Sequence, residues 1–153
     1  MNLPKHPTNE LTENEIELLH ALLTPFEELR QKRGDKPHLG GMCVMVSEVA
    51  ARILTEKKFR QTTWHHQRGR YGTNLPQTGP FLPGHSWLVS GCGNFMLDLT
   101  ADQYGEERIY FGRPTAQYVK VPDDFSEILD TGFYDPAKAA YEACLRCQQS
   151  DCA

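Results

Sequence analysis

The apolar pattern of this chain changes after Lys57, from helical spacing to strand-like segments, and this change constrains the fold most. Residues 42–57 are predicted to form a helix with one buried face, because their apolar residues recur at helical intervals (Cys43, Val46, Ala50, Ile53 and Leu54). Residues 62–71 and 118–121 are predicted strands, and residues 85–90 and 94–100 form a predicted hairpin around Gly91-Cys92-Gly93. Helices followed by an antiparallel sheet predict an α+β fold in which the central, Cys43-bearing helix packs on the sheet.

Further helices are predicted at both ends of the chain. Thr12 followed by Glu15 is a capping box, which marks a helix start. Thr24-Pro25 repeats the start signal with proline at the first helical position, so a second short helix is expected to run to about Arg33. Asp135-Pro136 predicts the start of a C-terminal helix. The 153 residues are expected to form one domain, 1–153, with a short flexible tail from about residue 148.

Composition and charge argue against several kinds of partner. The net charge is −4 and no long basic run is present, so neither nucleic acid nor an anionic membrane surface is an expected partner. No stretch approaches the roughly 20 apolar residues that span a bilayer, and the N-terminal residues lack a signal-peptide pattern. The chain is therefore expected to be made in the cytoplasm, while export without a cleaved signal, or delivery as an effector, stays open. The oligomeric state stays open as well.

Five cysteines, an odd number at uneven spacing, argue against a disulfide framework and leave at least one thiol free. Cys92 is expected to be exposed at the tip of the hairpin loop. Cys144 and Cys147, with Cys152 nearby, form no convincing redox or metal motif and are expected to be incidental thiols in a solvent-accessible tail.

Cys43 has the sequence context of a nucleophile. It begins the central helix just after Gly40-Gly41. The positive end of the helix dipole and the unpaired N–H groups of the first turn favour a thiolate there and can receive an oxyanion. The alternative interpretation is that Cys43 is a small buried apolar residue on the packed face of the helix.

His85 and Asp98 are predicted partners on the two strands of the hairpin. A histidine at the start of a strand can act as general base for a thiol and then as general acid. A lone Asp98 among apolar residues needs a partner, and an imidazole N–H would serve. A four-residue loop over 90–93 would place His85 directly opposite Asp98, whereas a three-residue loop would send Asp98 to the other face.

Three pieces of sequence in this order resemble the papain-like and transglutaminase-like cysteine enzymes. They are Gly41-Met42-Cys43, His85-Ser86-Trp87 and Asp98-Leu99-Thr100. The last continues to Gln103-Tyr104, which is similar to small bacterial and phage-type members, including toxin-like glutamine deamidases. The resemblance covers about residues 40–104.

The resemblance implies amide-bond chemistry on a protein or peptide substrate, without a cofactor. It makes Cys43 the nucleophile, His85 the general base and acid, and Asp98 the orienting carboxylate. The reaction stays open among glutamine deamidation, transglutamination and proteolysis, and the alternative is an inactive binding module on the same fold.

The same resemblance bears on the groups around the catalytic residues. Papain-type members carry a glutamine shortly before the nucleophile, but residues 37–42 contain none and Gln31 lies further upstream. Transglutaminase-type members use a tryptophan N–H instead, so the expected oxyanion donors are the backbone N–H of Cys43 and the indole of Trp64. Trp87 and Gln103 are expected to line the substrate site.

His65-His66 invites a metal interpretation. Adjacent strand residues point to opposite faces, so the two rings cannot easily bind one ion, and the usual tetrahedral ligand set is missing from the sequence. No metal site is predicted.

Overall fold

The computed structural model describes residues 10–33, 43–71, 84–101, 109–115, 118–120 and 132–150. The described elements, in chain order, are α1 (Glu13–Arg33), α2 (Cys43–Glu56), a 3-10 turn η1 (Phe59–Gln61), β1 (Trp64–Tyr71), β2 (Gly84–Ser90), β3 (Met96–Asp98), β4 (Tyr110–Gly112), β5 (Tyr118–Lys120) and α3 (Tyr134–Ser150). The strands form one antiparallel sheet in the order β4-β3-β2-β1-β5. The predicted α+β class is confirmed.

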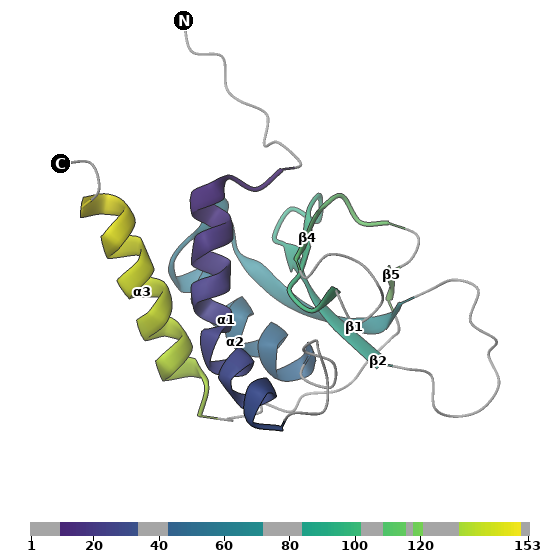
Figure 1. Ribbon diagram of the computed structural model, residues 1–153. Helices are drawn as coiled ribbons and strands as arrows, with labels where there is room; N and C mark the ends of the chain where they lie inside the picture. Colours follow the sequence, from purple (N-terminus) through teal and green to yellow (C-terminus); the bar gives the residue numbers. More distant parts are fainter. Residues whose placement is uncertain are drawn as a thin grey trace, which may run out of the picture.

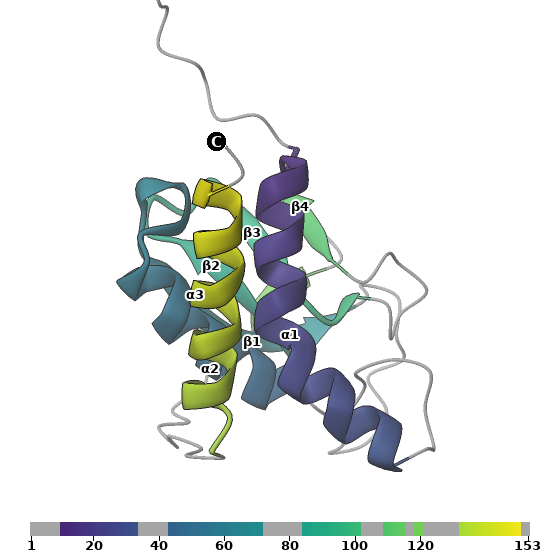
Figure 2. The same ribbon diagram turned by 60° about the vertical axis from the view of Figure 1, so that its left-hand side comes forward.

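The helices cover one face of the sheet. Helix α2 packs directly on β1 and β2, whereas α1 and α3 pack against each other, as Figures 1 and 2 show. Leu88 and Leu97 lie opposite each other in β2 and β3, so they project on the same face, and both belong to the core formed with the helices. One apolar core therefore joins the helical layer to this face of the sheet.

Helix α1 is continuous, so the prediction of two separate N-terminal helices is wrong. The capping box at its start is confirmed, because Thr12 and Glu15 exchange hydrogen bonds of 2.8 and 3.1 Å between backbone N–H and side-chain oxygen. Pro25 lies inside the helix, where the Thr24 hydroxyl donates to the carbonyl of His20 at 3.2 Å. In Figure 2 the C-terminal part of α1 runs at an angle to its first part, as a proline inside a helix produces.

The continuity of α1 follows from packing on both sides of its proline. Leu22 and Leu23 before Pro25 and Phe26 after it are fully buried. Burying such side chains contributes about 1.5–3 kcal/mol each, which together exceeds the roughly 3 kcal/mol that a proline costs inside a helix.

The hairpin of β2 and β3 has a different register from the predicted one. Leu88 pairs with Leu97 and Val89 with Met96, and the Ser90 N–H donates to the Phe95 carbonyl, so the loop consists of residues 91–94 rather than 90–93. The loop still holds an even number of residues, which keeps His85 and Asp98 on the same face. Continuing this register places Asp98 opposite Trp87, diagonal to His85.

Two further differences from the predictions lie in the last third of the chain. β4, which no sequence pattern indicated, pairs with β3 and forms one edge of the sheet. Helix α3 extends to Ser150, and the Gln148 side chain donates to the Asn14 carbonyl at 2.8 Å, whereas a flexible tail was expected from about residue 148. Residues 151–153, including Cys152, lie outside the described residues.

Candidate functional site

A buried histidine–carboxylate pair lies at one end of the sheet. His85, the second residue of β2, and Asp98, the last residue of β3, are 1% and 0% exposed. The distance from His85 Nε2 to Asp98 Oδ2 is 2.7 Å. A carboxylate only accepts hydrogen bonds, so a proton lies on Nε2 and the His85 ring donates to Asp98. The structure thus brings together two of the predicted site residues, His85 and Asp98.

Asp98 accepts hydrogen bonds on both of its oxygens. Thr100 donates its backbone N–H at 3.0 Å and its hydroxyl at 3.3 Å to Oδ1. Tyr118, on β5, donates its hydroxyl at 2.7 Å to Oδ2, the oxygen that also faces His85. The bond to the Thr100 N–H is a local turn that an Asp forms with the residue two positions on, which explains why this Asp ends the strand. Four donors around one buried carboxylate fix its position.

Aromatic rings surround the pair on the face of the sheet that points away from the helices. The His85 ring lies 5.8 Å from Trp87 and 6.0 Å from Tyr118, and Trp87 meets Tyr118 edge-on at 5.2 Å. Tyr110 stacks on Tyr118 at 6.0 Å. Trp87, predicted to line the substrate site, therefore lies beside His85. The burial and ring contacts hold the imidazole in one orientation.

Cys43 is the first residue of α2, as predicted, but its side chain lies outside the described part of the structure. Two contacts show the direction of α2: Glu48 meets His66, and Thr55 meets Trp64. Helix α2 thus runs antiparallel to β1. Five residues of helix before Glu48 cover about 7.5 Å, or roughly two strand residues beyond His66, so the start of α2 lies near the level of Arg68.

This level is the one at which His85 lies, because Gly69 pairs with His85. The backbone of Cys43 and the His85–Asp98 pair therefore share one end of the sheet. The His85 side chain leaves the sheet on the face opposite to the one that α2 covers, since it is three residues from Leu88 along β2. The His85 ring and helix α2 therefore lie on opposite faces of the sheet.

Trp64 is not brought to this site. Trp64 begins β1 opposite Ser90, five residues or about 16 Å of strand from the pair Gly69–His85. Its indole N–H donates to the Phe59 carbonyl at 3.0 Å, which makes Trp64 part of the core rather than an oxyanion donor. Gln103 lies outside the described residues.

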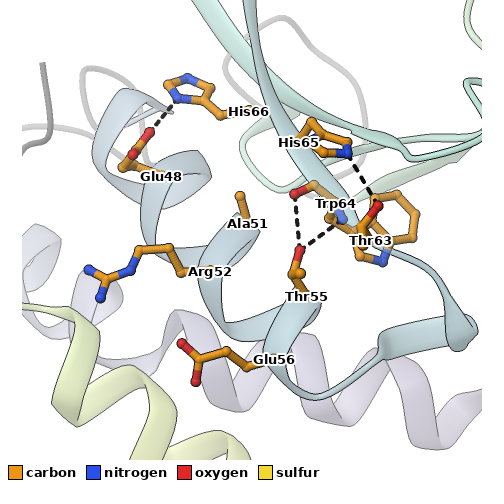
Figure 3. A pocket seen from close by; sticks show the side chains of 9 residues that line it. All are labelled: Glu48, Ala51, Arg52, Thr55, Glu56, Thr63, Trp64, His65 and His66. Atoms are coloured by element: carbon orange, nitrogen blue, oxygen red, sulfur yellow. Dashed lines mark hydrogen bonds and ion pairs between the residues drawn. The ribbon is translucent and has the colours of Figure 1, made fainter. Parts of the chain in front are cut away.

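His65 and His66 make separate contacts, as Figure 3 shows. His65 Nε2 lies 3.2 Å from the Thr63 hydroxyl, whereas His66 Nδ1 lies 2.7 Å from Glu48 Oε2 on α2. They line an open pocket of about 450 Å³ between α2 and the start of β1, together with Glu48, Ala51, Arg52, Thr55, Glu56, Thr63 and Trp64. Within the described ranges, no three His, Cys, Asp or Glu side chains are grouped to hold a metal ion.

The other described cysteines lie away from the pair. Cys92 is exposed in the hairpin loop, as predicted, and hydrogen bonds from Ser90 and from backbone groups lower the pKa of its thiol. Cys144 is half-buried on α3, where burial raises the pKa of its thiol, and Cys147 is exposed. No helix in the described part of the chain is both long and apolar enough to cross a lipid bilayer.

Comparison with protein-family models, with curated proteins and with solved structures gave no match to this chain. A function therefore has to be inferred from the chemistry of the residues themselves. Among these, Tyr118 was not predicted as a site residue. It lies 20 residues from Asp98 on another strand, and no local pattern indicates the hydrogen bond between them.

Proposed function

We propose that this protein is a cysteine-dependent hydrolase or acyltransferase that acts on amide bonds of a protein or peptide. Cys43 is the nucleophile, His85 the general base and acid, and Asp98 the carboxylate that orients the ring. The observation that supports this best is the buried 2.7 Å contact between His85 Nε2 and Asp98 Oδ2, which fixes the imidazole against a carboxylate. A papain-like or transglutaminase-like arrangement, a cofactor-free reaction and synthesis in the cytoplasm, with delivery as an effector open, belong to the same proposal.

The proposed reaction has two stages. His85 Nδ1 accepts the proton of the Cys43 thiol, and the sulfur attacks the amide carbon, whose oxygen receives the displaced electron pair and is stabilised by N–H groups at the start of α2. The C–N bond then breaks, the nitrogen leaves with the proton from His85, and a thioester remains. Water or an amine then attacks the thioester carbon and gives a proton to His85. The C–S bond breaks, the acid or the new amide leaves, and the sulfur takes the proton back from His85 to restore the thiol.

A second candidate is a binding module on the same fold without chemistry. The observation that favours it is that His85 and Asp98 are almost completely buried and project away from the face that α2 covers. In this alternative the pair only stabilises the sheet, and Cys43 is a buried apolar residue.

Selective alkylation separates the two candidates. A thiol paired with an imidazolium is largely thiolate near pH 6, where a free thiol is less than about 1% thiolate. Allowing for the lower intrinsic nucleophilicity of such a thiolate, Cys43 should react with iodoacetamide about tenfold faster than the exposed Cys147. The measurement uses peptide mass mapping of the full chain carrying Cys92→Ser, because hydrogen bonds lower the pKa of the Cys92 thiol as well.

The matched variants are His85→Gln, which fills the buried position, and His65→Ala on the exposed side of β1. The proposal requires that H85Q remove the preference for Cys43 and that H65A leave it unchanged. Equal or slower reaction of Cys43 in the parent protein, with H85Q having no effect, would establish the binding module instead.

The class of reaction is distinguished by product mass. A glutamine-containing model peptide gains about 1 Da on deamidation, loses ammonia and gains the amine on transfer, and is cut on proteolysis. A chain that carries Cys43→Ser is the blank for all three.

A further inference from the structure

We propose that Tyr118 is a positioning residue of this site, which holds the carboxylate of Asp98 and limits how strongly Asp98 binds the protonated His85 ring. The role in catalysis rests on the function proposed above. The hydrogen bond that carries the inference belongs to the described structure and is independent of that function.

The geometry assigns each oxygen of Asp98 its own pair of donors. Thr100 supplies both donors to Oδ1, whereas His85 and Tyr118 each approach Oδ2 to 2.7 Å. Thr100 is two residues from Asp98 and reaches it through a local turn. Tyr118 donates from β5, the edge strand at the far side of the sheet from β3, so it fixes Oδ2 through a contact that is distant in sequence.

The ring of Tyr118 is held in place by its neighbours. It packs edge-on against Trp87, lies 6.0 Å from His85 and stacks on Tyr110 at 6.0 Å. The aromatic contacts already fix the ring, so the Tyr118 hydroxyl forms its hydrogen bond to Asp98 at little further cost in side-chain entropy.

Sharing one oxygen has an electrostatic consequence. A hydroxyl that donates to Oδ2 stabilises the charge of the buried carboxylate and competes with His85 for it. Without that hydroxyl the carboxylate would attract the protonated ring more strongly. His85 should then keep its proton to higher pH, by about one pH unit, which is the usual scale of such neighbour effects.

Tyr110 provides a matched control. It lies in the same aromatic layer, yet its hydroxyl donates to the Arg113 carbonyl at 2.9 Å and not to Asp98. Tyr118→Phe and Tyr110→Phe each remove one hydroxyl from neighbouring stacked rings, so the difference between them isolates the bond to Asp98.

The test is an NMR titration of the full-length protein labelled in its histidine rings, with the His85 signals assigned by their loss in His85→Gln. We expect Y118F to move the His85 titration by about one pH unit to higher pH and Y110F to leave it in place. No difference between Y118F and Y110F from pH 4 to 10, or a shift of Y118F to lower pH, overturns the inference.

A second readout separates this inference from the proposed function. The pH profile of Cys43 alkylation should follow the His85 titration in Y118F. If the NMR titration moves while Cys43 alkylation does not, Tyr118 is a positioning residue of a pair that does not serve Cys43, and the proposed function fails alone. If Y118F does not fold, the protein made with 3-fluorotyrosine, a stronger hydrogen-bond donor, should show a His85 titration moved to lower pH, and an unmoved titration overturns the inference.

Discussion

Replacing Asp98 by asparagine tests the site at the group on which four hydrogen bonds converge. The amide oxygen can keep the two bonds from Thr100, while the amide nitrogen takes the place of Oδ2. It then faces two donors, the Nε2–H of His85 and the hydroxyl of Tyr118. Both can adapt, because the imidazole can move its proton to Nδ1 and the hydroxyl can rotate.

The expected loss of stability follows from this exchange. Two charge-assisted hydrogen bonds of about 1.5–3 kcal/mol become neutral ones of about 0.5–1.5 kcal/mol, while the variant no longer buries a charge. We expect D98N to lower the free energy of unfolding by about 2 kcal/mol, which is about 6 °C in Tm for a chain of this length. D98A leaves all of the donors without an acceptor and should cost about 3–5 kcal/mol.

The assays are urea unfolding, with Glu28→Gln on the exposed surface of α1 as the control, and NMR of the His85 ring nitrogens. We expect the proton on Nε2 in the parent protein and on Nδ1 in D98N. With Nδ1 protonated, the ring could no longer accept the Cys43 proton there, so the preferential alkylation of Cys43 should be lost as well. A D98N protein as stable as its parent, or with the proton still on Nε2, would show that the Asp98 contacts do not hold the site.

Three further predictions concern regions away from this pair. Thr12→Ala removes one half of the capping box and should lower the free energy of unfolding by about 1 kcal/mol in urea. Burial raises the pKa of Tyr141 to about 12. An unfolded tyrosine ionises near pH 10, so between about pH 10 and 12 unfolding releases a proton from this residue. The free energy of unfolding should therefore fall as the pH rises through this range, and it should fall less in Tyr141→Phe. With iodoacetamide near pH 7, Cys92 should react before Cys144, and Ser90→Ala should slow Cys92, as peptide mapping would measure.

Local patterns were sufficient for much of the fold. The helical spacing of the central segment predicted α2 to within one residue at each end, and the capping box predicted the start of α1. Both signals depend on contacts within a few residues of each other. The sequence also predicted correctly that His85 and Asp98 lie on one face of the sheet. Side chains alternate along each strand, so any hairpin loop with an even number of residues gives this result.

Features that depend on distant parts of the chain were not predicted. The loop of the hairpin shifted by one residue at each end because Ser90 pairs with Phe95, and the local sequence allows either register. Trp64 was assigned to the site by order along the chain, whereas the structure places its indole in the core against Phe59. The hydrogen bond from Tyr118 to Asp98 depends on the pairing of β5 with β1, and the residues around Tyr118 do not indicate this pairing.

The packing of α1 against α3 has a consequence for how the chain is synthesised. The two helices are separated by about one hundred residues of sequence but lie side by side, with Tyr141 of α3 in the core beside the leucines of α1. While a ribosome is still making the sheet, α1 has no α3 to cover it. Its apolar side is then available to chaperones, and the helical layer closes only once residues 134–150 have emerged.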